Sequence, residues 1–456
     1  MDRIAIIGGG ISGLSLAFFL LEKDPALDII VLEAEKRPGG KIWTEKTEGF
    51  LCEGGVNGFL DNKPRTLELA AKVALEPLRS NDASRKRFIF SGNRLHRLPE
   101  SPLAFLASGL MSLKGKLRIM VEPVIPGKVR EEETLSEFAR RRLGKEAYEK
   151  LIDPMASGIY AGNPETLSLR ACFPRVYDLE ALYGGLIRGM IHLQREKKKQ
   201  GSRERVEAGP GGTLTSFYDG MGALASAIRR FLGERLILEK KVQGIERKGQ
   251  RYSLFFADGS STEADIVVSA SPAYAVSEML KNMDRRLSNL VAEIPYPSLS
   301  VVCLGYRKEK IKTPVEAFGF LIPSREKRKI LGTLYDSSIF PNRAPEGYVL
   351  LRSMVGGARY SDLARENDTK LVDLVKGELA ATMDIRSDPD FARVYRHEMA
   401  IPQYNVGHLE RLRNIETILL RHKNLYLTGN AYRGIGVNDC IENSLMLAEK
   451  IIEESC

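Results

Sequence analysis

The residues with the clearest chemical potential are three glycines near the start of the chain, in the pattern G-x-G-x-x-G at Gly8, Gly10 and Gly13. The first glycine allows a tight turn, the second lets the backbone approach a pyrophosphate, and the third lets a helix and a strand pack closely. Glu33 stands 20 residues beyond Gly13, where a carboxylate accepts hydrogen bonds from ribose hydroxyls. These residue types at this spacing predict the binding of a dinucleotide.

This pattern has chemical meaning only if a strand, a helix and a second strand position it. "RIAIIG" reads as a buried strand, "GGISGLSLAFFLLEKD" as a turn and a helix, and "DIIVLEAE" as a second strand that Glu33 ends. The phosphates are then expected at the helix N-terminus, where the helix dipole attracts negative charge. The residues that this pattern predicts to contact the dinucleotide are Gly8, Gly10, Gly13 and Glu33.

A second glycine-rich loop follows the second strand, with Arg37, Gly39, Gly40 and Lys41 in "KRPGGK". The order strand-Glu-x₃-Arg-x-Gly-Gly resembles FAD proteins of the amine-oxidase and phytoene-desaturase type, which favours FAD over NAD. The "EGG" that begins at Glu53 resembles the segment that brings backbone against the flavin ring in those enzymes.

The composition sets the broad class of protein. The 456 residues are enough for about two or three domains. The net charge of +9 favours an anionic partner or an anionic membrane face. Five scattered cysteines without a CxxC pair fit a reducing compartment and exclude a disulfide framework. No signal peptide and no run of roughly 18 apolar residues is present, so we expect an intracellular protein, soluble or attached to a membrane surface.

The middle of the chain has a different character. Residues 98–125 are apolar with interspersed basic residues, and they either lie on a membrane surface or are buried in a helical subdomain. Residues 132–162 read as two helices broken at Gly144, with Thr134 as the N-cap. Residues 195–213 are highly charged and then rich in Gly and Pro, which predicts a solvated linker. No aromatic residues interrupt this basic tract, which argues against nucleic-acid binding.

The second half of the chain alternates strands and helices. Residues 220–233 are predicted as a helix, Asp258 and Gly259 as a hairpin turn, and "ADIVVSAS" as a buried parallel strand. From residue 286 to about 410, strands and a helical stretch at 361–383 suggest an α+β domain, with a long helix near 368–383 expected to cover the sheet. Near the end, "YLTGNAYRGIGVNDCIENS" reads as a strand, a glycine-rich loop and a helix from about Asn438.

The chain resembles protoporphyrinogen oxidases, which are FAD enzymes near the end of haem synthesis, over nearly its whole length. The resemblance is carried by "GGGISGLSLAFFL", "EGGVNGFLDNKPRTLELA", "SGIYAGNPETLSLRACFP", "AFGFLIPSRE", "AIPQYNVGHLERL" and "GNAYRGIGVNDCIENS". It implies an α/β Rossmann-type FAD-binding domain, an α+β substrate-binding domain and an α-helical membrane-associated domain. The implied bounds are residues 1–85, 208–285 and 411–456 for the first domain, 286–410 with about 86–91 for the second, and 92–207 for the third.

The resemblance also assigns residues to the sites. Around FAD it adds Gly9, Ile11, Ser12, Ala34, Arg37, Gly40, Lys41, Gly55, Val56, Asn57, Gly58, Val242, His397, Gly429, Ile435, Gly436 and Val437. The helix near Asn438 is then expected to point its positive end at the pyrimidine side of the flavin. His397 stands where many relatives carry a tryptophan, so it is either a flavin neighbour or a partly buried structural histidine. For the substrate it implies Arg87 as the partner of a propionate, Phe318 and Met354 against the macrocycle, and Gly158 as the residue that leaves space.

The implied reaction is oxidation of protoporphyrinogen IX to protoporphyrin IX. Three rounds of hydride transfer to flavin remove six electrons, and O₂ reoxidises the flavin to give hydrogen peroxide. We find no Ser/His/Asp or Cys/His set and no metal-ligand spacing, so no side-chain base or metal is predicted. The alternatives are a coproporphyrinogen oxidase, a flavin amine oxidase or carotenoid desaturase, and a non-catalytic FAD-binding porphyrin carrier. The resemblance also implies peripheral attachment to a membrane and a homodimer, and we expect a cytoplasmic location.

Overall fold

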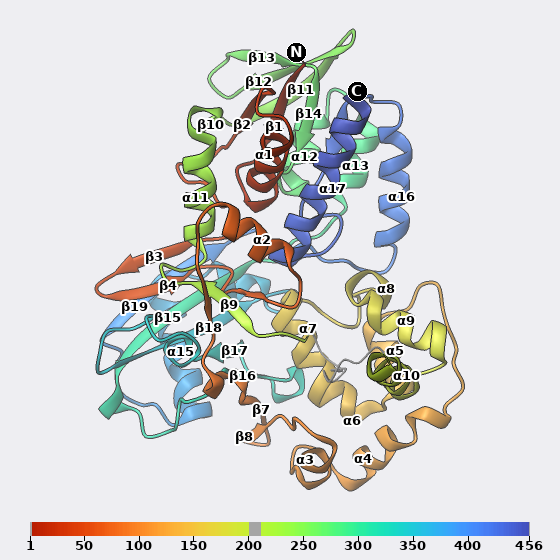
Figure 1. Cartoon of the computed structure of the whole chain (residues 1–456). Coiled ribbons are helices and arrows are strands. Elements are labelled where there is room, and N and C mark those ends of the chain that lie inside the picture. Colours follow the sequence, from red (N-terminus) through yellow and green to blue (C-terminus); the bar gives the residue numbers. More distant parts are fainter. Residues whose placement is uncertain (1, 200–210, 456) are drawn as a thin grey trace.

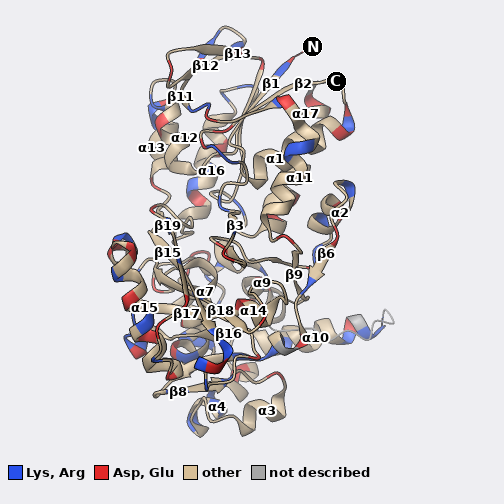
Figure 2. Cartoon of the chain, turned by 90° about the vertical axis from the view of Figure 1, so that its left-hand side faces the viewer, with Lys and Arg blue, Asp and Glu red and all other residues tan. Residues whose placement is uncertain are grey.

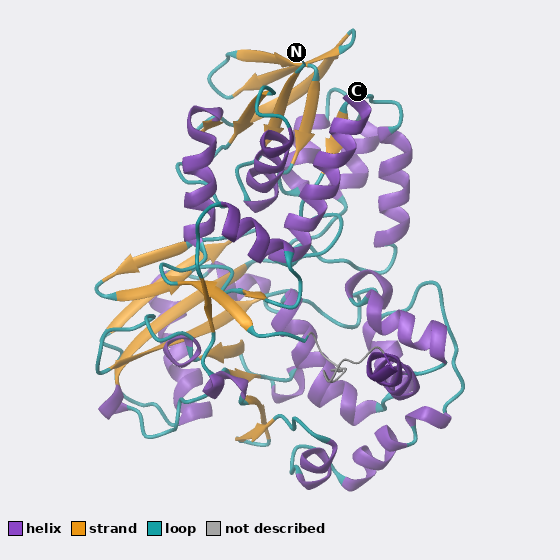
Figure 3. Ribbon diagram, viewed as in Figure 1, coloured by secondary structure: helices purple, strands orange, loops and turns teal. Residues whose placement is uncertain are grey.

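The computed structural model of the chain describes residues 2–199 and 211–455. The described residues form three regions. A parallel sheet with helices lies nearest both termini, a strand-rich region adjoins it, and a helical region lies beside the strand-rich one (Figure 1, Figure 3). In Figure 2 basic and acidic positions are interspersed over most of the chain.

The first region is built on a five-stranded parallel sheet with the order β10-β2-β1-β14-β20. Ile6 in the central strand lies opposite Val31 on one side and Val268 on the other. The strands are β1 (Arg3–Ile7), β2 (Asp28–Leu32), β10 (Leu236–Ile237), β14 (Ile266–Ser269) and β20 (Leu425–Leu427). The strand near the C-terminus therefore completes the sheet that the first strand begins.

Successive residues of β1 point to opposite faces of this sheet, which divides its core in two. Ile4 and Ile6 pack with α1, α11 and α17, whereas Ala5 and Ile7 pack with α12, α13, α16 and a small antiparallel sheet. The elements are α1 (Ile11–Lys23), α11 (Gly222–Leu232), β11 (Val242–Lys248), β12 (Arg251–Phe256), β13 (Ser261–Ala264), α12 (Ala273–Leu280), α13 (Arg285–Ala292), α16 (His408–Leu419) and α17 (Val437–Ser455). Helices thus cover both faces of the sheet.

The strand-rich region contains a seven-stranded sheet with the order β19-β15-β18-β17-β16-β7-β8. Only β7 and β16 pair in parallel. Leu351 of β18 packs on α15, while Leu350 packs on the β3–β4 hairpin at the opposite face. The elements are β3 (Thr44–Thr47), β4 (Phe50–Glu53), β7 (Arg87–Ser91), β8 (Arg94–Arg97), β15 (Leu299–Arg307), β16 (Gly319–Leu321), β17 (Ile330–Leu334), α14 (Asp336–Ile339), β18 (Tyr348–Gly356), α15 (Asp368–Met383) and β19 (Phe391–His397).

A separate three-stranded sheet, with the order β5-β9-β6, lies between the first two regions. Its middle strand runs antiparallel to both neighbours and leads directly into α11. The elements here are β5 (Phe59–Leu60), α2 (Arg65–Lys72), β6 (Pro77–Arg79) and β9 (Leu214–Phe217).

The helical region begins after β8 and extends through the last residues described before the gap. Thr134 and Glu137 form a capping box at the start of α5, and α5 ends before Gly144, which has φ +92°. A π-helical turn, Tyr148–Ile152, joins α6 to α7. The helices are α3 (Pro102–Ala107), α4 (Leu113–Met120), α5 (Leu135–Arg142), α6 (Lys145–Ala147), α7 (Asp153–Tyr160), α8 (Leu169–Cys172), α9 (Pro174–Tyr183) and α10 (Leu186–Lys199).

Two predicted segments differ from the structure. The predicted linker at 195–213 is wrong for residues 195–199, which continue α10, because basic residues in the last turn of a helix complement its dipole. Its remainder at 200–210 lies outside the described residues. The predicted helical stretch at 361–383 forms its long helix only from Asp368, because the Asn367 side chain accepts the N–H of Lys370 at 3.0 Å and caps it there.

The predicted strands and helices of the parallel sheet, the Gly144 break and the Thr134 cap are confirmed. Within the described residues, no helix is both long enough and apolar enough to cross a membrane. Membrane association of the helical region and the three domain boundaries stay predictions.

Candidate active site

The turn between β1 and α1 has the shape that a phosphate-binding loop needs. Gly8 has φ +108°, and a Cβ on Gly13 would lie 1.9 Å from the carbonyl oxygen of Gly8. A Cβ on Gly10 would meet only the Cα of Gly40, at 3.9 Å. The N–H groups in the first turn of α1 have no helical acceptor, and the space before them is free of side chains at Gly10. This loop fits the pyrophosphate of a dinucleotide.

Glu33 is buried beside this loop, directly after β2. Its carboxylate accepts the N–H of Gly9 at 2.6 Å and the N–H of Glu35 at 2.8 Å. Burial raises the pKa of Glu33, although both hydrogen bonds oppose the shift. Ala34 lies between Glu33 and Glu35 in the sequence. A carboxylate has lone pairs for about four hydrogen bonds, so Glu33 can hold the loop and still accept from a ribose.

The second glycine-rich loop lies against the first. The N–H of Gly39 donates to the carbonyl of Gly9 at 2.8 Å, and Gly39 and Gly40 both have positive φ. Arg37 spans this loop and donates to the carbonyl of Gly40 at 2.9 Å. Its guanidinium also lies 4.6 Å from the centre of the Trp43 ring. The structure therefore brings both predicted loops together and adds Trp43, which the sequence analysis missed.

The segment after β4 is pressed against Lys41. A Cβ on Gly55 would lie 2.0 Å from the carbonyl oxygen of Lys41. Lys41 Nζ donates to the carbonyl of Met399 at 2.6 Å, and burial lowers the Lys41 pKa to about 8. Val56 packs against the core of the parallel sheet. Asn57 is buried, and neither polar atom of its side chain has a hydrogen-bond partner among the described residues.

An unpartnered buried amide is rare in a folded protein, because burying a polar group without a partner costs free energy. Asn57 lies in the segment assigned to FAD, so a bound cofactor can supply the hydrogen-bond partner that its amide lacks. The glycine loops supply the matching space for the phosphates. The residues present therefore fit FAD.

Gly58 and Val242, which are also predicted to bind the cofactor, lie beside this site. A Cβ on Gly58 would lie 2.6 Å from the carbonyl oxygen of Thr215 in β9. Val242 begins β11 and packs with Leu32 at the end of β2. Gly58 therefore lies next to β9, and Val242 shares an apolar cluster with Leu32, the residue just before Glu33.

His397 ends β19 and contacts the segment after β4. Its Nε2 lies 2.7 Å from the carbonyl oxygen of Gly54, and its ring meets the Trp43 ring edge-on at 6.2 Å. Burial lowers the pKa of His397, which keeps the ring neutral at pH 7. His397 thus touches the backbone that the resemblance places near the flavin.

The loop after β20 returns to the start of α1. A Cβ on Gly429 would lie 3.7 Å from Ser12 Oγ, and Ser444 Oγ donates to the carbonyl of Ser12 at 2.8 Å. Val437 begins α17 and packs in the same core as Ile11. The loop after β20 and the start of α17 therefore lie beside the start of α1.

The residues before α17 carry a contact that the sequence analysis missed. The N–H of Gly436 donates to the Asp439 carboxylate in the first turn of α17 at 3.2 Å, so this N–H is already paired. Ile435 packs against an apolar cluster of the helical region that includes Tyr160. Cys440 is buried, and burial raises its pKa to about 11, so its thiol stays protonated at neutral pH.

Three of the four predicted substrate residues lie on or beside β7, β16 and α7, in two separate contacts. Arg87 is exposed, and its guanidinium lies 5.0 Å from the centre of the Phe318 ring. A Cβ on Gly158 would lie 2.9 Å from the side chain of Leu321. Leu321 was missed, because a leucine in a strand gives no signal of the surface that it faces. We refer to Arg87, Phe318 and Leu321, which lie on or beside the paired strands β7 and β16, as the substrate wall.

Met354 lies farther along the same sheet. It is half-buried on β18, opposite Gly332 of β17, and packs with Leu331 and Ala161. The structure therefore pairs Arg87 with Phe318, places Gly158 against Leu321 of β16, and leaves Met354 on β18, two strands away from β16.

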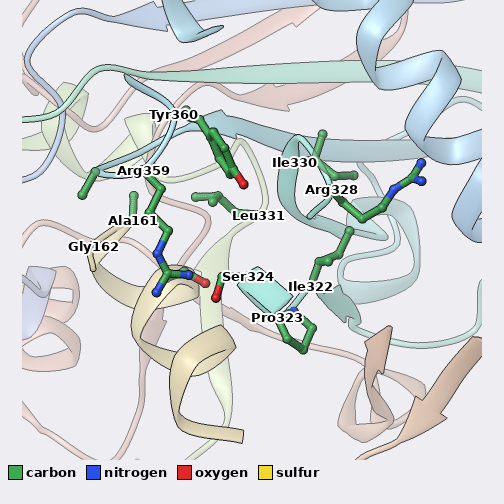
Figure 4. A pocket seen from close by; sticks show the side chains of 13 residues that line it. Ala161, Gly162, Ile322, Pro323, Ser324, Arg328, Ile330, Leu331, Arg359 and Tyr360 are labelled. Carbon is green, nitrogen blue, oxygen red and sulfur yellow. The ribbon is translucent and has the colours of Figure 1, made fainter. Parts of the chain in front are cut away.

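A small cavity lies beyond Met354, between the end of α7, the β16–β17 turn and the segment after β18 (Figure 4). Arg359 borders it on one side and Arg328 on another. Its volume of about 20 Å³ holds about one water molecule. The cavity is therefore not the place for a large ligand, and no described group of His, Cys, Asp or Glu is arranged to hold a metal ion.

Comparisons with known proteins agree with this geometry. A family model described as flavin containing amine oxidoreductase matches residues 11–452. The chain is 32% identical to the coproporphyrinogen III oxidase of Bacillus subtilis (strain 168) over 96% of each chain. It is 33% identical to the chloroplastic protoporphyrinogen oxidase 1 of Arabidopsis thaliana, over 98% of this chain and 87% of that protein. A crystal structure of a proposed protoporphyrinogen oxidase from Exiguobacterium sp. 255-15 superposes with a TM-score of 0.85 at 27% identity, over 99% of each chain.

Proposed function

The chain belongs to the flavin-containing amine oxidoreductase family and is an FAD-dependent oxidase, and on that premise we propose that it oxidises protoporphyrinogen IX to protoporphyrin IX in haem biosynthesis. The observation that carries this proposal is the wall of Arg87, Phe318 and Leu321. A porphyrinogen is a large apolar macrocycle with propionates at one edge, and it needs an apolar surface bordered by a cation.

When bound, FAD supplies a two-electron oxidation, and we propose O₂ as the acceptor. Arg87 binds a propionate through its planar guanidinium, which matches a carboxylate. Phe318 and Met354 lie against the macrocycle, and Gly158 leaves room for it. The side chains of Arg87, Phe318 and Met354 do not accept a proton at neutral pH, so these residues bind and orient the substrate and supply no general base.

A second candidate substrate is coproporphyrinogen III. It is favoured by the relative from Bacillus subtilis, which matches over 96% of each chain. Coproporphyrinogen carries four propionates, and its recognition needs more cations than Arg87.

Anaerobic mixing separates these possibilities. The purified protein with FAD bound is mixed with protoporphyrinogen and, separately, with coproporphyrinogen, and the flavin absorbance band is followed. We expect faster bleaching with protoporphyrinogen. Faster bleaching with coproporphyrinogen would establish the second candidate, and bleaching with neither would overturn porphyrinogen oxidation in favour of a non-catalytic carrier.

Replacement of Arg87 tests its role at the rim. Arg87→Ala is expected to raise KM for the porphyrinogen about 10- to 100-fold, because a charge-assisted hydrogen bond contributes roughly 1.5–3 kcal/mol. FAD content and kcat should change little. Steady-state kinetics measure the effect, with Arg85→Ala as the matched control because exposed Arg85 contacts Asp82 at 3.3 Å. An equal KM in both variants would remove Arg87 from the substrate site.

We also propose that the protein acts in the cytoplasm, attached to an anionic membrane face through α3, α4 and the turn after them. Large apolar side chains are exposed there, with Leu103 at 80%, Leu113 at 77% and Val124 at 74%. Figure 2 shows no charged residue on α3 and basic residues on α4. Apolar insertion and attraction to anionic lipid act together in such segments. A homodimer, which the resemblance also implies, stays a prediction.

Vesicle sedimentation tests this attachment. Leu103→Asp/Leu113→Asp should reduce the fraction bound to phosphatidylglycerol vesicles about tenfold or more. Inserting each of these two leucines into the membrane contributes roughly 1.5–3 kcal/mol to binding. Leu420→Asp is the matched control, since Leu420 is 83% exposed at the end of α16. Equal binding of both variants would exclude this surface.

A further inference from the structure

Two side chains of the seven-stranded sheet hold three consecutive carbonyl groups of the segment after β4. Arg352 Nη1 donates to the carbonyl oxygen of Glu53 at 3.2 Å and to that of Gly55 at 3.0 Å. His397 Nε2 lies 2.7 Å from the carbonyl oxygen of Gly54. Because a carbonyl only accepts, the neutral ring of His397 carries its proton on Nε2. Residues 53–55 are therefore fixed by donors from β18 and β19.

The first of these donors is itself held in place. Arg352 is 2% exposed, and its Nε lies 2.9 Å from the carboxylate of Asp336, which is fully buried at the start of α14. Burial raises the pKa of Asp336, and the nearby Arg352 opposes that shift. A guanidinium locked this way can present its N–H groups to two carbonyls with little loss of side-chain freedom.

The side chain of Glu53 is fixed separately from its carbonyl. It accepts the N–H of Met221 at 2.8 Å and the hydroxyl of Thr44 at 2.6 Å, and Arg343 lies 3.8 Å away. Burial raises the Glu53 pKa to about 7. Residues 53–55 are thus held in two ways. The Glu53 side chain binds Met221 and Thr44, and the three backbone carbonyls bind the seven-stranded sheet.

The same sheet carries the substrate wall. Arg352 and Met354 are two residues apart on β18 and therefore point to the same face. His397 lies opposite Leu299 of β15, which in turn lies opposite Gly356 at the end of β18. One face of this sheet thus bears both the predicted substrate contact and the donors that hold residues 53–55.

We propose that Arg352 and His397 are positioning residues for the flavin. They fix, from the substrate side, the segment whose next residues, 56–58, are predicted to contact FAD. The clamp sets the distance between the cofactor and the face of the sheet that carries Met354. The inference rests on FAD as the family's cofactor and does not depend on which porphyrinogen is oxidised.

A structural role alone would have a different signature. A buried ion pair that only stabilises the fold would lower the stability of the apoprotein, and FAD affinity would fall only in proportion. A clamp changes the flavin's surroundings and lowers FAD affinity by more than any loss of apoprotein stability accounts for. The measurements are therefore the FAD dissociation constant, the visible circular dichroism of bound flavin, its midpoint potential and the unfolding midpoint of the apoprotein.

The first test replaces His397, which can be changed without leaving a buried charge. His397→Leu is expected to weaken FAD binding about tenfold and to alter the flavin dichroism, because one buried carbonyl loses its donor. kcat should fall while KM for the porphyrinogen stays constant. His397→Gln, whose amide N–H has a similar reach, should restore most of the affinity. His96→Leu is the matched control, since His96 Nε2 lies 3.0 Å from the carbonyl of Ser91 at the far edge of the sheet.

The second test removes Arg352 together with its counter-charge. Asp336→Asn/Arg352→Met avoids an unpaired buried carboxylate and is compared with Asp336→Asn alone. The double variant should lose FAD affinity about tenfold beyond the single variant and shift the midpoint potential. Parent-like affinity, dichroism and potential in both His397→Leu and the double variant would overturn the proposal, as would losses that only track the apoprotein unfolding midpoint. These flavin measurements need no porphyrinogen, so they stand even if porphyrinogen oxidation fails.

Discussion

A Gly10→Ala variant is expected to fold like the parent protein and to bind FAD about 10- to 100-fold more weakly. Gly10 has φ −72°, which alanine adopts without strain, and its added Cβ would meet only the Cα of Gly40 at 3.9 Å. The apoprotein therefore has room for the methyl group, whereas a pyrophosphate approaching the N-terminus of α1 does not. Overpacking of this kind costs roughly 1–3 kcal/mol, which is about 10- to 100-fold in affinity.

Two other glycines make the test specific. Gly13→Ala would place a Cβ 1.9 Å from the carbonyl oxygen of Gly8, so both apoprotein stability and FAD binding should fall. Gly377→Ala has nothing within 4 Å in the middle of α15 and should gain up to about 1 kcal/mol of stability. FAD titration and the unfolding midpoint of the apoprotein are measured for all three. Parent-like FAD affinity in Gly10→Ala would place the phosphates elsewhere.

The cofactor half of the site was predictable because its signals are local. Gly8, Gly10 and Gly13 follow a strand and begin a helix within a few residues, and Glu33 ends the next strand. The return of the chain at β20 was also predictable, since a short apolar strand before a glycine-rich loop repeats the pattern at the start of the chain.

The contacts between the regions were not predictable from the same signals. Arg352 lies 299 residues from Glu53, and His397 lies 343 residues from Gly54. An arginine within the apolar strand "YVLLRSMVGG" shows that a buried partner must exist, but it does not identify Asp336 or the carbonyls. Trp43 alone offered a usable hint, as the one tryptophan of the chain, close after the second glycine-rich loop. Residue spacing predicts local turns, whereas the pairing of distant strands decides which side chains meet.

The helical region depends on a buried ion pair that the sequence did not reveal. Arg142 at the end of α5 and Glu122 are both fully buried. Arg142 donates to Glu122 from Nε at 2.9 Å and to the carbonyl of Gly184 from Nη2 at 3.2 Å. Glu122 accepts the N–H groups of Leu186 and Ile187, at 2.9 Å and 3.0 Å, where α10 begins. One carboxylate thus joins α5 to the first turn of α10.

Arg142→Met should therefore destabilise the helical region by about 3–5 kcal/mol, because it leaves a buried carboxylate without its cation. The one tryptophan, Trp43, lies in the cofactor region and does not report on these helices. Amide hydrogen exchange at Leu186 and Ile187 reports directly, and it should accelerate more than about a hundredfold. Arg97→Met is the matched control, since Arg97 contacts Glu100 at 2.8 Å with both side chains more than half exposed, and exposed pairs contribute only about 0–1 kcal/mol.

The double variant Arg142→Met/Glu122→Met separates the charge from the hydrogen bonds. It removes the unpaired carboxylate, which should recover part of the loss, but it leaves the N–H groups of Leu186 and Ile187 without their acceptor. Protection at these two amides should then lie between the parent and Arg142→Met. Recovery to the parent level would mean that the start of α10 does not need Glu122, and exchange no faster in Arg142→Met than in Arg97→Met would mean that the pair does not hold α10 on α5.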